Sequence, residues 1–117
     1  MQLTFYKYQG TGNDFIIIDN RTNVFDRSNN ALVAKLCDRR FGIGADGLML
    51  LQAKAGYDFE MVYYNSDGNE SSMCGNGGRC IVEFARTLGL VKEKAFFIAT
   101  DGEHHANVQP GFISLKM

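Results

Sequence analysis

A cysteine stands in this sequence where a polar, glycine-rich stretch gives way to an apolar, periodic one. Cys74 follows the turn-forming residues 65–72. Apolar residues recur after it at helical spacing: Cys80, Ile81, Phe84, Ala85 and Leu88. We therefore expect Cys74 at the N-terminus of a helix, where unpaired backbone N–H groups and the helix dipole favour negative charge. Both effects favour a thiolate and lower a cysteine pKa below its free value of about 8.5.

The same turn has the features of an anion-binding cradle. Free N–H groups at a helix N-terminus bind carboxylates and phosphates. The glycines at positions 75, 77 and 78 leave room for a ligand to approach the backbone, and Arg79 adds a positive charge. The sequence thus places a candidate base or nucleophile and an anion cradle in one turn.

The alternative for any cysteine in a small domain is a buried apolar filler. Cys37 and Cys80 fit that interpretation, because each falls on the apolar face of a predicted helix. Cys74 differs from them, since Gly, Asn and Ser surround it and offer little to pack against. The sequence favours Cys74 as the reactive thiol.

Composition restricts the class of partner. The chain has 117 residues, 45% of them hydrophobic, which is enough for one domain with its own core. A formal net charge of −1, with acids and bases interspersed, gives no basic patch for nucleic acid or for a membrane surface. No apolar run has the length of a membrane span, and the start does not resemble a signal peptide. A small-molecule partner and a cytoplasmic location follow, the latter because three cysteines form no disulfide framework.

The elements that must position Cys74 can be predicted from the same patterns. Two helices are expected, one capped by Ser28 or Asn29 and ending in Arg39-Arg40, the other following Cys74. The two arginines are expected to complement the end of the first helix and to lie in solvent. Strands are expected at 3–9, 15–19, 48–51, 57–64, 95–100, 104–109 and 112–117. The final strand leaves the chain without a closing element, which indicates an incomplete protein.

The loop predicted at residues 10–14 allows two interpretations. Asn13 and Asp14 either serve the turn chemistry of an ordinary hairpin, or Asn13 binds a ligand. The sequence does not choose between them.

Three motifs that suggest other sites fail on their context. The pattern Gly42-x-Gly44-x-x-Gly47 follows a helix and precedes a strand, the reverse of a dinucleotide-binding motif. The stretch 65–76 begins like a calcium loop but has Glu70 where that loop requires Gly. His104 and His105 lack a second ligand pair at zinc spacing, so we expect them on opposite faces of a strand. No metal site is predicted.

Taken together, three motifs in this order resemble the N-terminal half of diaminopimelate epimerase. They are Gly10-x-Gly12-Asn13-Asp14-Phe15, Gly42-Ile43-Gly44-Ala45-Asp46-Gly47, and Asn65-x-Asp67-Gly68 followed by Met73-Cys74-Gly75-Asn76-Gly77-x-Arg79-Cys80. The resemblance extends along essentially the whole chain. It implies an α+β fold, a mixed, partly barrel-like β-sheet wrapped around a central helix, with residues 1–117 as a single N-terminal domain of a two-domain enzyme.

The resemblance also implies a reaction. Members of this family interconvert LL- and meso-diaminopimelate in lysine biosynthesis, without pyridoxal phosphate or metal, using one cysteine from each domain. Cys74 would be one of the two acid/base residues. Gly75 and Asn76 would bind substrate through the turn, and Asn13 and Asn65 would bind its polar groups.

Part of that site is missing from this chain. Some family members have Gln in place of Gly47, so no side-chain contact is expected at that position. The second catalytic cysteine belongs to the C-terminal half of the family, which is absent, so we expect little or no activity from this chain alone. A homodimer is possible, as in the family.

Two competing functions stay open at this point. One is a racemase or isomerase of the same fold, such as a proline racemase or a phenazine-biosynthesis isomerase. The other is a non-catalytic module that binds a small anion or assembles with another chain. Thiol reactivity separates the second from an enzyme, because only a base requires a lowered pKa at Cys74.

Overall fold

The middle of the sheet is buried on both faces, and its strand β3 (Gly47–Gln52) contains the uninterrupted apolar run 48–51. A computed structural model describes residues 3–10, 12–72, 75–109 and 112–116. All six residues of β3 are buried, as expected for an uninterrupted apolar run enclosed by two layers. The elements are β1 (Tyr6–Gly10), β2 (Asn13–Asp19), α1 (Asn30–Cys37), β3 (Gly47–Gln52), β4 (Phe59–Asn65), β5 (Glu70–Ser71), α2 (Gly75–Thr87), β6 (Lys94–Ala99), β7 (Gly102–Gln109) and β8 (Phe112–Lys116).

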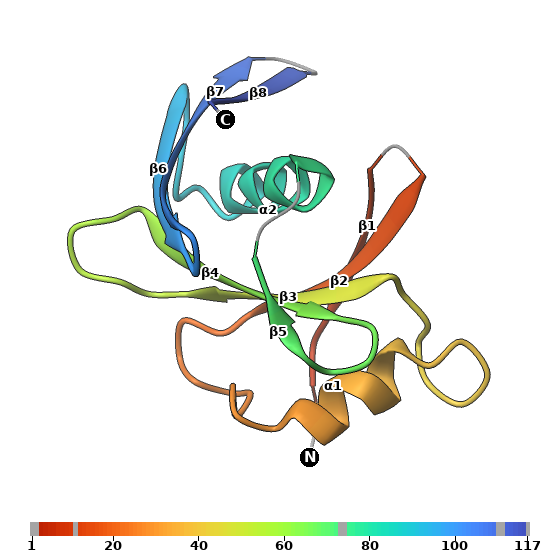
Figure 1. Cartoon of the computed structure of the whole chain (residues 1–117). Helices are drawn as coiled ribbons and strands as arrows, with labels where there is room; N and C mark the ends of the chain where they lie inside the picture. The colour runs from red at the N-terminus through yellow and green to blue at the C-terminus, as the bar shows by residue number, and fades with distance from the viewer. Residues whose placement is uncertain (1–2, 11, 73–74, 110–111, 117) are drawn as a thin grey trace.

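The strands form one mixed sheet. Its order is β1-β2-β3-β4-β6-β7-β8, with β5 paired to β4 off this path. The pairs β2–β3 and β4–β6 are parallel, and the other pairs are antiparallel. The sheet curls around α2, while α1 lies against the opposite face (Figure 1). This confirms the predicted mixed, curled sheet wrapped around a central helix.

The strand periodicity of two separates the two faces into two cores. Met49 and Leu51 of β3 pack with α2, where Ile81 and Phe84 are at most 1% exposed. Leu48 and Leu50 face α1 instead. Cys80 is buried in the first core and Cys37 in the second, which confirms both as packing residues.

Helix α1 ends earlier than predicted, and its end explains the second glycine motif. Asn29 caps the helix, as expected, but the helix stops at Cys37 and does not reach the two arginines. The backbone N–H groups of Ile43 and Gly44 donate to Leu36 O at 2.9 and 3.0 Å. A Cβ on Gly42 would lie 2.0 Å from Lys35 O. The glycine motif therefore closes the C-terminal end of α1, whose last carbonyls need partners.

The first hairpin is tighter than predicted. Asn13 and Asp14 were expected in a loop, but both belong to β2, and Asn13 pairs with Gly10 of β1. Gly12 has φ of 79°, a conformation that glycine adopts without strain. Asn13 is thus held on a strand at its turn end.

None of the helices in the described ranges has the length and apolarity to cross a membrane.

Candidate active site

The first turn of α2 rests on the β1–β2 hairpin. Asn76 Nδ2 donates a hydrogen bond of 2.8 Å to Asn13 Oδ1. A Cβ on Gly10 would lie 3.0 Å from the Cβ of Asn76, so the backbone of the hairpin closely approaches the helix. Arg79, one turn later, donates to Asn76 Oδ1. The side chain of Asn76 therefore holds the first turn of α2 against the hairpin.

Asp46 holds the other side of Asn13. Its Oδ2 accepts from Asn13 Nδ2 at 3.3 Å and from the backbone N–H of Asp14 at 3.0 Å. A primary amide has two donor hydrogens and two acceptor lone pairs. Asp46 and Asn76 use one of each, which fixes which end of the Asn13 amide carries the oxygen. Among the residues that the structure describes, no other side chain takes the second donor hydrogen or the second acceptor lone pair of Asn13.

A cluster of charges fixes Asp46 and the start of β2. Arg39 donates to Asp14 through both terminal nitrogens, at 2.8 and 3.1 Å, and reaches Asp46 Oδ1 at 3.2 Å. Lys7 Nζ is 3.0 Å from Asp14 Oδ2. The Arg39 guanidinium holds the pKa of Asp14 well below its usual range, with a further contribution from Lys7. The prediction that the two arginines complement the helix end is wrong for Arg39, because its guanidinium bridges Asp14 of the first motif and Asp46 of the second.

We expect Asp14→Asn to lower the free energy of unfolding at pH 7 by roughly 1 kcal/mol, because solvent screens this partly exposed ion pair. The folded-state pKa of Asp14 is depressed, so the pairing stabilises the chain above the ordinary carboxyl pKa of about 4 and is lost progressively below it. The difference in free energy of unfolding between Asp14→Asn and the unchanged chain, measured by urea unfolding, should therefore become smaller as the pH falls below about 4. Asp101→Asn, which breaks the pair with His104, is the control. A difference in free energy of unfolding that does not change with pH would contradict a stabilising ion pair at Asp14.

Asn65 lies on the same face and at the same end of the sheet as Asn13. It pairs with Gly47, which in turn pairs with Phe15. Residues two apart on a strand share a face. Asn13 therefore lies on the same face as Phe15, and Asn65 on the same face as Tyr63. Phe15 and Tyr63 both pack in the α2 core. The two asparagines are thus brought to the edge at which α2 begins.

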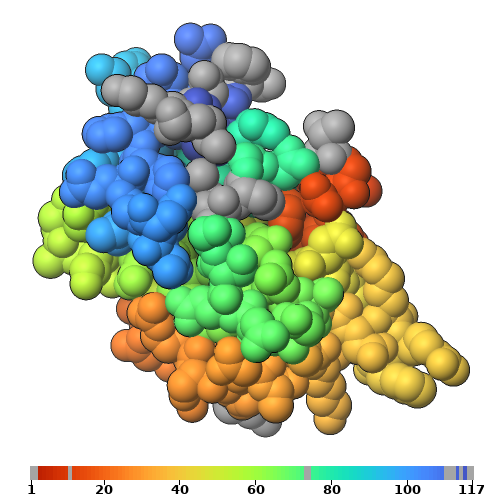
Figure 2. Space-filling model, in the orientation of Figure 1, coloured from red at the N-terminus to blue at the C-terminus, as the bar shows by residue number. Residues whose placement is uncertain are grey.

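The turn after Asn65 is built into the fold. The N–H of Gly68 donates to Asn65 O at 2.9 Å, which confirms a tight turn within the stretch 65–72 that was predicted to be turn-forming. Gly68 has φ of 91°, and a Cβ there would lie 2.4 Å from Asn30 O. The β4–β5 turn, drawn in green in Figure 2, packs directly on the orange segment that enters α1. This packing fixes the position of Asn65 from outside the site.

The predicted thiol itself lies outside the described residues. Cys74 directly precedes Gly75, and α2 begins at Gly75, so the predicted helix start is confirmed. The role of Cys74 stays a prediction. Across the described ranges, no group of three His, Cys, Asp or Glu side chains could hold a metal ion. His104 and His105 stack on Phe97 and Phe96, neighbouring rings of β6, away from these residues.

Sequence reasoning did not predict a role for Asp46. The position of Asp46 inside the second motif was the only indication of such a role in the sequence. The glycines of that motif suggest a nucleotide site and not a role for the carboxylate. Only the parallel pairing of β2 with β3 shows that the residue before Gly47 meets the residues before Phe15.

Comparison with known proteins identifies the family of this chain. Residues 5–109 match the family model of diaminopimelate epimerase. The chain belongs to the diaminopimelate epimerase family. It is 63% identical over 116 residues to diaminopimelate epimerase of Flavobacterium psychrophilum, covering 98% of this chain and 45% of that protein. For the enzyme of Alkaliphilus metalliredigens the identity is 47% over 100 residues, with coverage of 86% and 35%. The chain thus spans less than half the length of these relatives.

Solved structures with low sequence identity to this chain share its fold. A PhzF-family phenazine biosynthesis protein of Enterococcus faecalis superimposes with a TM-score of 0.74 at 9% identity, over 97% of this chain and 43% of that one. A methylitaconate-delta-isomerase gives a TM-score of 0.69 at 13% identity, over 99% and 63%. These likenesses establish a half of the diaminopimelate epimerase/PhzF-like fold.

Proposed function

We propose that this chain is the N-terminal half, a single domain, of an epimerase that interconverts LL- and meso-diaminopimelate in lysine biosynthesis. One observation carries the proposal: α2 begins at Gly75, directly after Cys74, and its first turn is fixed to Asn13 by the 2.8 Å hydrogen bond from Asn76. A helix N-terminus and an oriented asparagine amide therefore lie side by side, and the candidate base Cys74 directly precedes this helix in the sequence. Family membership supplies the substrate.

In the proposed reaction, the Cys74 thiolate takes the proton from the substrate Cα. That carbon is a very weak acid, so the thiolate must already be formed and largely removed from water. The electron pair left on Cα is delocalised into the substrate carboxylate, whose growing charge is stabilised by preorganised N–H donors at Gly75 and Asn76. A second thiol on the opposite face returns a proton to Cα and inverts it. The two thiols exchange roles in the reverse direction.

The other half of the site comes from outside this chain in our proposal. The chain covers 45% of its Flavobacterium psychrophilum relative, so the second thiol and the opposing wall of the cleft are assigned to the remainder. Asn13 and Asn65 hold polar groups of the substrate from the half described above. A homodimer and a cytoplasmic location are part of the proposal, the latter because an odd count of three cysteines is not typical of a disulfide framework.

A chimera tests this function directly. In it, this chain replaces the matching 116-residue segment of the Flavobacterium psychrophilum enzyme. We expect the chimera to interconvert LL- and meso-diaminopimelate within about tenfold of the rate of the parent, and the isolated chain to show little or no turnover. An inactive, folded chimera beside an active parent would contradict the proposal. Turnover of proline but not of diaminopimelate would instead support a related racemase.

Thiol reactivity distinguishes the enzyme from a non-catalytic anion-binding module. Burial raises the pKa of the Cys37 thiol to about 11, so Cys37 is an internal reference for an unreactive thiol. We expect iodoacetamide to alkylate Cys74 of the folded chain with an apparent pKa below the free value of about 8.5. An apparent pKa of 8.5 or more, with a rate no higher than that of Cys37, would favour the module.

A further inference from the structure

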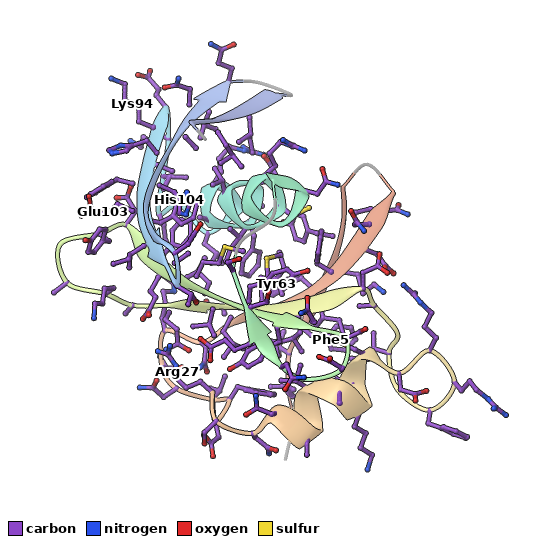
Figure 3. All side chains as sticks on the ribbon, viewed as in Figure 1. Phe5, Arg27, Tyr63, Lys94, Glu103 and His104 are labelled. Carbon is purple, nitrogen blue, oxygen red and sulfur yellow. The ribbon has the colours of Figure 1, made fainter. Side chains whose placement is uncertain are left out.

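The phenol of Tyr63 lies across Gly47 on the α2 face of the sheet. A Cβ on Gly47 would lie 2.9 Å from Tyr63 Oη and 3.2 Å from its Cζ, so the ring occupies the space of a side chain at position 47. Tyr63 is 9% exposed, and its ring packs edge-on against Phe15 with centroids 6.1 Å apart. Figure 3 shows Tyr63 in the layer between α2 and the central strands. Packing on Gly47 and Phe15 thus determines where its hydroxyl lies.

The strand register places this hydroxyl close to the candidate active site. Tyr63 itself pairs with Met49, but its Oη lies over Gly47, two residues nearer to the start of β3. Gly47 pairs with Asn65 on one side and with Phe15 on the other. The hydroxyl therefore reaches the row of the sheet that contains Asn65, one strand repeat from Asn13.

The chemistry of this edge suits an anionic group. The N-terminus of α2 favours negative charge at this edge. The Asn13 amide donates one hydrogen to Asp46 Oδ2 and has a second donor hydrogen. A tyrosine hydroxyl can donate one hydrogen bond and can rotate to aim it. In a site largely removed from water, a hydrogen bond to a charged group is stronger than one between neutral groups.

We propose that Tyr63 Oη donates a hydrogen bond to a carboxylate of the bound amino acid and so positions the substrate. No side-chain contact with substrate was expected from Gly47. Because position 47 is glycine, the phenol of Tyr63 occupies the space that a side chain there would take, and it supplies the contact instead. The inference rests on the proposed function. It assigns a substrate-binding residue that none of the three sequence motifs contains.

Tyr63→Phe in the chimera tests the inference, because it removes the oxygen and keeps the ring on Phe15. We expect kcat/KM for diaminopimelate to fall about tenfold or more, mainly through a higher KM, as for the loss of a hydrogen bond to a charged group. The melting temperature should change little. Tyr64→Phe is the matched control: it removes the same atom from the next residue, whose hydroxyl donates to Arg27 O on the opposite face of the sheet. That variant should lose stability and keep its KM.

Each outcome decides the inference. A higher KM in Tyr63→Phe alone supports it. An active chimera whose KM is the same with and without the Tyr63 oxygen overturns it and leaves the proposed function intact. A loss of activity that only follows a loss of folded protein, as measured by the melting curve, also overturns it. An inactive, folded chimera overturns the proposed function and this inference together.

Discussion

Cys74→Ala in the chimera should lower the rate of interconversion of LL- and meso-diaminopimelate by about 1,000-fold or more. A positioned acid or base contributes on the order of 100- to 10,000-fold, and alanine supplies no group that can take the Cα proton. The change is small and adjoins a helix start, so the melting temperature should be almost unaltered. Initial rates measured in both directions, with melting curves, check this expectation.

Cys37→Ala is the matched control. Cys37 is 3% exposed in the core on the α1 side of the sheet, so its substitution should cost some stability and leave the rate within about threefold. Retention of a tenth or more of the activity by Cys74→Ala would contradict its role as a base. An equal loss in both cysteine variants would indicate a general effect on folding.

Asn13→Asp should lower kcat/KM by on the order of 100-fold, because it replaces an amide donor by a second carboxylate. Asn13 Nδ2 lies 3.3 Å from Asp46 Oδ2, so the new oxygen would face a like charge at that distance. The same oxygen would repel a substrate carboxylate held at the N-terminus of α2. We expect most of the loss in KM, measured from initial rates over a range of substrate concentrations.

The control for this variant is Asn107→Asp on β7, which adds the same charge at an exposed position of the sheet. It should leave kcat/KM unchanged. If Asn13→Asp kept kcat/KM within about threefold of the unchanged chimera, Asn13 would have no part in binding. A comparable loss in both variants would point to net charge and not to the position of Asn13.

Local sequence patterns predicted the elements whose signals are local. The apolar repeat after Cys74 gave α2, and its start at Gly75 follows from the change from glycine turn to helix. The uninterrupted run at 48–51 gave a buried strand. The family motifs gave the mixed sheet, which no periodicity can show, because pairing partners are far apart in sequence.

The candidate site depends on long-range register, and there the sequence was insufficient. Arg39 sits two residues after a helix, where a local rule assigns it to the helix end, yet it pairs with Asp14, 25 residues away. The contact of Tyr63 with Gly47 likewise follows only from the pairing of β3 with β4. The order of the strands, and not the composition of any one motif, brings these groups together.

The central claim, that Cys74 takes the Cα proton, is tested most directly by deuterium incorporation at Cα in heavy water. LL- and meso-diaminopimelate are each incubated with the chimera and with its Cys74→Ala variant. We predict that the chimera incorporates deuterium into both isomers. The variant should interconvert neither and should lose exchange in the isomer whose Cα hydrogen faces position 74, while the second thiol can still exchange the other. Exchange of both isomers by Cys74→Ala at the unaltered rate would contradict the account.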